Sequence, residues 1–337
     1  MKKIFVRSPY FIEINEAGQL GSKIELRFKK SGGSYPTNPN YVLSKKIPSS
    51  TQTNTIYNIS NYAREFINPI KPQTITTAPE STDIWCFMEV KRYKEDPANT
   101  YTLLTTEEFV CLDGYTNYSG GYNQSTTASV VPLLNTNINI QRNVNNNVYI
   151  NVYFDAGDYD IDNGTTVTVF SLAAPQIYKV PLDANSIIIS EDGVGTVATI
   201  NSNSICEPKY IPKVVWFINR FGGWQPLTFF KANNEAYEMQ NVKHKLMPEF
   251  VNYNTSVGQY KQFNFNGKQT IKINTGYVPE NYSELMQDLL LSEKILIEDK
   301  PVIIKSQNMQ IKTSLNDKVI NYEVEFEYNY NLMNSVL

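Results

Sequence analysis

The sequence predicts a mainly β protein, with two N-terminal β-sandwich-like domains followed by a C-terminal α+β unit in which a β-sheet packs on one amphipathic helix. Three observations favour this fold class. Short segments of alternating apolar and polar residues recur along the chain, turn-forming residues separate them, and one stretch near the C-terminus has a helical period. The expected domains are residues 1–125, 126–244 and 245–337, since 337 residues suit two or three domains.

The clearest strand is expected at residues 320–331. Its apolar positions alternate strictly with Asn and Glu, which is the period of a strand with one buried and one wet face. Each inward side chain contributes about 1.5–3 kcal/mol when it is fully buried. A strand at 308–314, joined by a turn at Asn316-Asp317, is expected to complete a hairpin. The inward positions are Ile320, Tyr322, Val324, Phe326, Tyr328 and Tyr330.

An amphipathic helix is expected between Pro279 and Ser292, where it can cover this hairpin. Pro279 and Glu280 suit the first turn, because the proline lacks only an N–H that would have no partner there and the carboxylate faces the positive helix end. Further strands are expected at 269–274, 294–298 and 302–305, which gives a compact β-β-α-β-β-β-type unit. The apolar stripe consists of Tyr282, Leu285, Met286, Leu289 and Leu290.

The first β-domain is expected to span residues 4–112. Alternation predicts strands at 10–14 and 23–29, and a short helix is expected at 61–67 with Ser60 as its N-cap. Residues 83–90 are apolar on both faces, so this strand is expected in the middle of a sheet with Cys86 in the core.

A linker or long loop is expected at residues 114–129, where Gly, Tyr, Asn and Ser occur without an apolar period. Beyond it, strands with short turns between them favour a sandwich. The section ends in a hairpin around Gly222-Gly223, which we expect to gather Trp216, Phe217, Phe221, Trp224 and Phe229 into one large apolar cluster.

The acidic segment around Asp158, Asp160 and Asp162 resembles the start of an EF-hand calcium loop. The glycine falls one place late, and Val169 stands where a bidentate Glu is required. A solvated hairpin turn with Asn163-Gly164 at its tip is therefore the favoured interpretation, and a structural Ca²⁺ is the alternative.

No catalytic, cofactor-binding or metal-binding residues are expected. His244 is the only histidine and lies between two lysines, so a surface or interdomain role is favoured over catalysis. Phosphate-binding glycine motifs are absent from the sequence. The row of Glu323, Glu325 and Glu327 is best explained as the wet face of a strand, although a pair of carboxylates of a glycosidase is defined only in space and stays an alternative.

Composition limits the partners. The formal net charge of −3 argues against direct nucleic-acid binding, and no apolar run is long enough to cross a membrane. Arg7 and Glu13 interrupt any apolar core of a signal peptide, so export by a leader of its own is not expected. Three cysteines, an odd and widely spaced set, do not suggest a disulfide framework or a zinc site.

Four stretches carry a resemblance to a known group of proteins. They are RSPYFIEI (7–14), YNISNYAREFI (57–67), WFINRFGGW (216–224) and the closing segments IKINTGY (271–277), LLSEKI (290–295) and KTSLNDKVINY (312–322). They resemble uncharacterised structural proteins of tailed bacteriophages that infect Bacteroidota, including crAss-like and flavobacterial phages. The C-terminal unit is also similar to the fold of tail-tube and distal-tail proteins.

This resemblance implies a non-enzymatic virion subunit of the tail, baseplate or head-tail connector ring, assembled in the host bacterial cytoplasm. The expected partners are copies of itself and other virion proteins, with residues 245–337 as the oligomerisation unit. A module that binds a host surface glycan or receptor through exposed aromatic side chains is the alternative function. The assembly candidates are Trp216, Phe221, Trp224, Tyr322, Phe326 and Tyr328.

Overall fold

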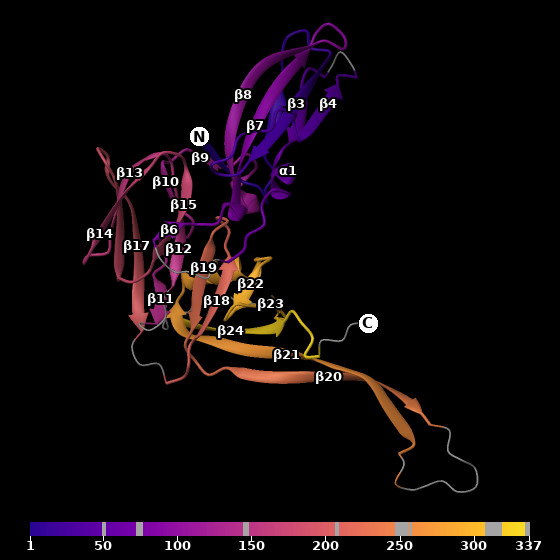
Figure 1. Ribbon diagram of the computed structural model, residues 1–337, viewed down its shortest axis with the longest axis vertical. Helices are drawn as coiled ribbons and strands as arrows, with labels where there is room; N and C mark the ends of the chain where they lie inside the picture. Colours follow the sequence, from indigo (N-terminus) through magenta and orange to yellow (C-terminus); the bar gives the residue numbers. More distant parts are fainter. Residues whose placement is uncertain are drawn as a thin grey trace. The chain divides into compact units, whose positions relative to one another are not determined.

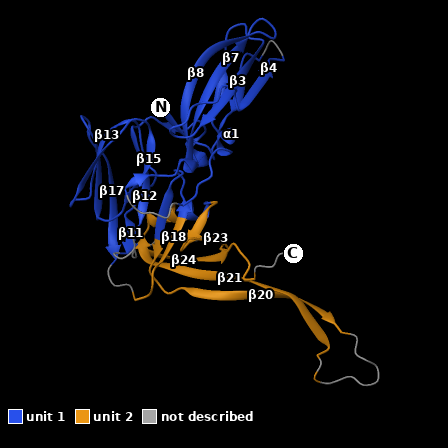
Figure 2. Cartoon of the chain, viewed as in Figure 1, with its two compact units in different colours: residues 1–206, 217–227, 287–292 blue, residues 207–216, 228–286, 293–337 orange. Residues whose placement is uncertain are grey.

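The computed structural model describes residues 1–48, 52–71, 77–143, 148–205, 209–246, 256, 258–306 and 319–333. Strands dominate and the two α-helices are short, which confirms the mainly β fold (Figure 1). The chain forms two compact units (Figure 2). Unit 1 comprises residues 1–206, 217–227 and 287–292, and unit 2 comprises residues 207–216, 228–286 and 293–337. The boundaries expected at residues 125 and 244 stay a prediction, because compactness does not show which segments fold independently.

Unit 1 begins with a six-stranded sheet in the order β4-β3-β7-β8-β1-β9. Neighbouring strands are antiparallel except for β1, which runs parallel to β8. As predicted, β7 lies inside the sheet and is buried on both faces at its start, and Cys86 lies in the core. The strands are β1 (Lys2–Phe5), β3 (Gly21–Lys29), β4 (Tyr41–Lys46), β7 (Trp85–Glu95), β8 (Tyr101–Leu112) and β9 (Ser125–Thr126).

One face of this sheet packs against the pair β2 (Phe11–Ile14) and β5 (Thr55–Asn58) and against α1 (Ser60–Arg64). The helix is shorter than expected, and the prediction of Ser60 as its N-cap is wrong. Ile59 holds the N-cap position, and the Ser60 hydroxyl instead donates to Asn58 Oδ1 at 2.8 Å. The Asn58 side chain also accepts a hydrogen bond from the Ser60 N–H. Asn58, and not Ser60, therefore supplies a side-chain acceptor at the start of the helix.

Two further sheets of unit 1 form the expected sandwich-like section. Their orders are β10-β12-β15-β6 and β11-β17-β16-β13-β14. Aromatic rings join them, since Phe154 contacts Tyr159 at 4.9 Å and Phe170 stacks on Tyr178 at 4.9 Å between ring centroids. The strands are β6 (Ala78–Pro79), β10 (Val130–Pro132), β11 (Ile140–Asn143), β12 (Tyr149–Phe154), β13 (Gly157–Asp162), β14 (Val167–Leu172), β15 (Gln176–Pro181), β16 (Ser186–Glu191) and β17 (Gly195–Ile205).

The segment 114–129, expected as a linker or long loop, is tied to the first sheet. Within it β9 pairs with β1, and Asn123 exchanges hydrogen bonds with the backbone of Phe11. Turn-forming composition did not reveal this pairing, because β9 has only two residues. Two 3₁₀ turns, η1 (Thr82–Ile84) and η2 (Tyr118–Gly120), complete this part of the chain.

The described C-terminal residues follow the predicted order of a strand, the helix and further strands. The antiparallel order β22-β23-β24-β21-β20 belongs to unit 2, while β18 (Lys213–Ile218), β19 (Trp224–Phe229) and α2 (Tyr282–Leu290) have residues in both units. The strands of unit 2 are β20 (Asn234–Lys245), β21 (Tyr260–Pro279), β22 (Ile295–Ile297), β23 (Lys300–Ile304) and β24 (Val319–Tyr328).

Strand β24 confirms the alternation that predicted it. Its five apolar positions from Ile320 to Tyr328 are buried, and Glu323 lies on the opposite face in an ion pair with Lys272. Tyr330 was expected to point inward, which is wrong: the strand ends at Tyr328 and Tyr330 is 40% exposed. The partner strand expected at 308–314 lies outside the described residues.

Candidate interaction surface

The most distinctive surface of unit 2 is a long antiparallel hairpin formed by β20 and the first half of β21. Its register runs from Asn234 opposite Lys272 to Lys245 opposite Tyr260, with one irregularity between Gln240 and Val242. Figure 1 shows it as a ribbon that continues past the other strands of this sheet. We call residues 234–245 and 260–269 the arm.

The arm has few neighbours within its own chain. Strand β20 is the last strand of its sheet, and all 12 of its residues are exposed. The pairing of β21 with β24 begins only at Thr270, so in the described chain residues 260–269 have a strand partner only in β20. The segment after β24 reaches the base of the arm, where Leu332 N donates to Gly267 O at 2.8 Å. The outer half of the arm is therefore a two-stranded ribbon.

Apolar side chains cover the arm although it is exposed. An isolated two-stranded hairpin is at best marginally stable in water, and exposed apolar groups add nothing to its stability. Exposed apolar side chains gathered on one element make it a candidate protein contact site. The side chains are Tyr237 (58% exposed), Met239 (65%), Val242 (49%), Tyr260 (61%), Phe263 (40%) and Phe265 (48%).

Charge on β20 is divided along its length. Glu235 and Glu238 lie in the half nearest the sheet, whereas Lys243, His244 and Lys245 lie in the outer half. Each of the two carboxylates has a partner on a neighbouring strand or next to one. Gln269 donates a hydrogen bond to Glu235 at 3.0 Å, and Lys305 forms an ion pair with Glu238 at 3.7 Å. A hydrogen bond to Glu325, with the nearby charge of Glu238, raises the pKa of Lys305.

The assembly candidates chosen from the sequence lie elsewhere. Five of them are buried within the chain, where they form core contacts, and Phe221 is half-buried with its ring 6.3 Å from that of Phe5. Trp224, the residue considered for glycan stacking, is only 2% exposed and therefore has no accessible ring face. The five buried residues are Trp216, Trp224, Tyr322, Phe326 and Tyr328.

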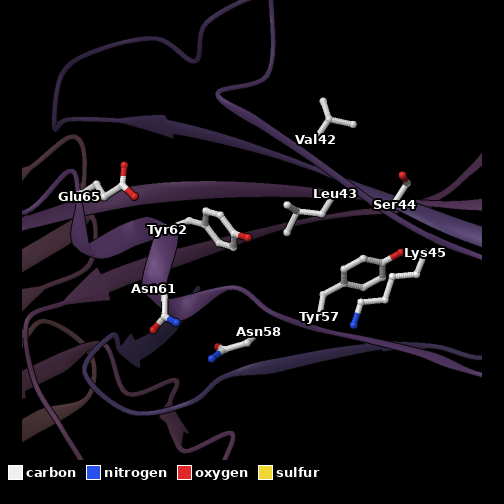
Figure 3. Close-up of a pocket in the computed structure, with 9 residues that line it drawn as sticks. All are labelled: Val42, Leu43, Ser44, Lys45, Tyr57, Asn58, Asn61, Tyr62 and Glu65. Atoms are coloured by element: carbon white, nitrogen blue, oxygen red, sulfur yellow. The ribbon is translucent and has the colours of Figure 1, made fainter.

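A hollow of about 740 Å³ lies in unit 1 between β4, β5 and α1 (Figure 3). Tyr57 and Tyr62 contribute aromatic surface, and Glu65 is the one carboxylate among its lining residues. Tyr41 donates a hydrogen bond to Glu65, which raises the pKa of the Tyr41 hydroxyl. A retaining or inverting glycosidase requires two carboxylates across its cleft, so the composition of this hollow does not fit that chemistry.

The acidic segment of the sandwich has the hairpin geometry that was favoured. Asp158, Asp160 and Asp162 occupy alternate positions of β13, and Asn163 N bonds to Thr166 O at 3.2 Å in the turn. Gly164 has φ = 81° there. Alternate residues spread carboxylates along one strand face instead of converging them on an ion. Among the described residues, no group of three or more His, Cys, Asp and Glu side chains could hold a metal ion.

Sequence reasoning missed the arm. His244 was correctly placed on the surface, with its ring 5.4 Å from that of Phe263, but β20 itself was not predicted. Because both faces of β20 are exposed, its sequence lacks a strict apolar alternation. The alternation of Phe263 and Phe265 with Gln262 and Asn264 was the available signal.

Comparisons with known proteins give no family for this chain. No protein-family model matches it, and no curated protein matches it significantly. Among the described residues, none of the helices has the length and apolar character needed to span a membrane.

Proposed function

We propose that this chain is a non-enzymatic structural subunit of a tailed bacteriophage virion, in the tail, baseplate or head-tail connector. It acts through contacts with copies of itself and with other virion proteins, without direct binding of nucleic acid. The observation that carries the proposal is the arm, an exposed β-ribbon that bears six exposed apolar side chains and whose outer strand, β20, pairs only with β21 among the described residues. The resemblance of the sequence to phage structural proteins agrees with this role.

The physical argument is that the arm gains stability from a neighbour. Free N–H and C=O groups at a strand edge are ready partners for another chain, and natural proteins usually block such edges. Permanent assemblies bury such surface in large interfaces, typically 2,000 Å² or more. In an assembly the arm can therefore be stabilised by a neighbouring subunit, which an isolated molecule lacks.

Two measurements test the proposal. Mass spectrometry of purified virions is expected to detect the chain as a stoichiometric component, and its absence from particles would overturn the proposal. A variant with Tyr237→Ser, Met239→Ser and Phe263→Ser is expected to be incorporated at a lower level. Val194→Ser is the matched control, because Val194 is 68% exposed in the sandwich of unit 1 and lies outside the arm.

A further inference from the structure

Strand β4 is the end strand of the first sheet, and among the described residues it pairs only with β3. Two hydrogen bonds show which of its backbone groups this pairing uses. Ile47 N donates to Leu20 O at 3.0 Å, and Asn40 N donates to Leu26 O at 2.8 Å. Because backbone direction alternates along a strand, the even-numbered residues of β3 direct their carbonyl groups toward β4.

The register then identifies the free backbone groups of β4. Lys45, Leu43 and Tyr41 lie opposite even-numbered residues of β3, so their backbone groups bond to β3. The N–H and C=O groups of Val42 and Ser44 therefore point away from β3, toward the open edge of the sheet. Both residues line the hollow beside α1, and in the described chain neither has a backbone hydrogen bond across it.

The side chains along this edge form a groove with a charge at each end. Leu43 and Tyr62 supply its apolar middle, since both pack, partly buried, against the core of the first sheet. Glu65 lies at one end, where the Tyr41 hydroxyl donates to it, and Lys45 lies at the other end (Figure 3). Tyr41 and Lys45 are four positions apart in β4, which is about 13 Å along a strand.

The register fixes where the side chains of an added antiparallel strand would lie. Residues opposite each other in an antiparallel pair point to the same face of the sheet. The residue opposite Lys45 therefore meets the ammonium group, and the residue opposite Leu43 meets the apolar middle. The residue opposite Tyr41 meets the Glu65 carboxylate. An acidic, an apolar and a basic residue at alternate positions match these three sites, and the hollow of about 740 Å³ has room for them.

We propose that the β4 edge binds an extended peptide segment of a protein partner as an added antiparallel strand. The segment carries an acidic, an apolar and a basic residue at alternate positions, and the residues between them bond to the backbone of Val42 and Ser44. In strand addition the main-chain hydrogen bonds supply affinity, and the side-chain sites supply specificity. The inference goes beyond the proposed function, because it assigns a site in unit 1 that does not depend on the arm.

Calorimetric titration with a synthetic peptide tests the site. The probe is acetyl-Thr-Glu-Thr-Val-Thr-Lys-Thr-amide, whose Glu, Val and Lys side chains match the groove. Saturable binding is expected, with slower amide hydrogen exchange at Val42 and Ser44. Proline in place of the two threonines that flank the valine removes both N–H donors, and is expected to weaken binding at least about tenfold. Absence of binding by the probe, or equal binding by the proline peptide, overturns the inference.

A charge exchange tests the direction of the added strand. Lys45→Glu is expected to weaken binding of the probe about threefold or more, because it places two carboxylates opposite each other. A peptide with Lys in place of the Glu is expected to bind this variant more tightly than the probe does. Lys2→Glu is the matched control, since it makes the same charge change in β1, which β8, β7 and β3 separate from β4. Circular dichroism checks that each variant is folded. An equal loss for Lys2→Glu, or no gain with the exchanged peptide, would overturn the assignment to β4.

Discussion

In unit 1, Lys3 Nζ lies 2.8 Å from Asp155 Oδ2, which joins strand β1 to the residue that follows β12. The Lys3 side chain has no exposed area, and its ammonium also donates to Ala128 O at 2.8 Å. Tyr153 donates to Asp155 Oδ1 at 2.7 Å, and burial together with this carboxylate raises the pKa of the Tyr153 hydroxyl. The first sheet and the sandwich-like section thus share a hydrogen-bonded ion pair with a fully buried lysine and a partly exposed aspartate.

Removing one member of this pair is expected to destabilise unit 1. Lys3→Met leaves the Asp155 carboxylate without its cation, and the loss is expected to be below the roughly 3–5 kcal/mol typical of a fully buried pair, because the Asp155 side chain is 24% exposed. Urea denaturation followed by circular dichroism measures the loss. Lys2→Met is the control, because Lys2 is the exposed neighbour in the same strand. The double variant Lys3→Met with Asp155→Asn is expected to cost less than the sum of the single changes, and simple additivity would contradict direct coupling.

The stability of unit 1 is expected to depend on the protonation of Glu80. This carboxylate is 3% exposed and accepts hydrogen bonds from Asn151 Nδ2 at 2.7 Å and from Ser81 N at 2.8 Å. Burial raises the pKa of Glu80 above its ordinary value of 4.5, and these hydrogen bonds offset only part of that effect. The native state therefore holds this proton to a higher pH than the unfolded chain does.

The direction of this pH dependence of the free energy of unfolding follows from proton linkage. As the pH rises above 4.5, the unfolded chain releases the Glu80 proton first, so this group makes a contribution to the free energy of unfolding that falls until the native carboxyl has also ionised. Glu80→Gln is expected to remove this part of the pH dependence. Chemical denaturation at a series of pH values from 4.5 upward measures it, with the exposed Glu16→Gln as the control. Identical profiles for Glu80→Gln and the unmodified chain would rule out a raised pKa.

The thiols of Cys86 and Cys111 are expected to be inert in the native state. The two residues face each other across β7 and β8, and both are buried and free. Burial, with the neighbouring Cys86, raises the pKa of Cys111 well above its ordinary value, and the thiolate is the reactive form. In a Cys206→Ser background, a thiol reagent is expected to label neither residue until the protein unfolds. Val194→Cys, at an exposed position, is the positive control; rapid labelling of the native pair would contradict the burial.

The hairpin between β18 and β19 is expected to require glycine at position 222. Gly222 has φ = 82°, and a Cβ there would lie 2.7 Å from Asp113 N. Gly222→Ala therefore combines left-handed backbone strain of about 1–2 kcal/mol with an overpacking cost of about 1–3 kcal/mol. Gly18→Ala is the matched control, since Gly18 has φ = 71° but no atom within 4 Å of its Cβ position. Equal thermal shifts for the two variants would show that packing at Gly222 is unimportant.

The alternation of a buried and a wet face made β24 predictable, but the same alternation in the four residues of β5 (Thr55–Asn58) was too short to be recognised. In β24 the buried face runs from Ile320 to Tyr328, so the alternation was visible, and the error at Tyr330 arose because a pattern does not show where pairing stops. In β20 both faces are exposed, so no alternation was imposed on its residues. Aromatic residues such as Trp224 were chosen as contact candidates because of their size, but size predicts burial in the core as readily as contact with a partner.

Core and arm residues of the same sheet are expected to respond differently to substitution. Ile271 is fully buried in β21, whereas Met239 is 65% exposed in β20 of the same sheet. Ile271→Ser is expected to lower the free energy of unfolding of unit 2 by about 2–5 kcal/mol or more, because it leaves a cavity and buries a hydroxyl. Met239→Ser is expected to change that free energy by less than about 0.5 kcal/mol, as for other surface substitutions, and to weaken self-association instead. Denaturation at a protein concentration below that of self-association separates the two effects, and a large loss of stability for Met239→Ser would show that Met239 stabilises the fold of its own chain.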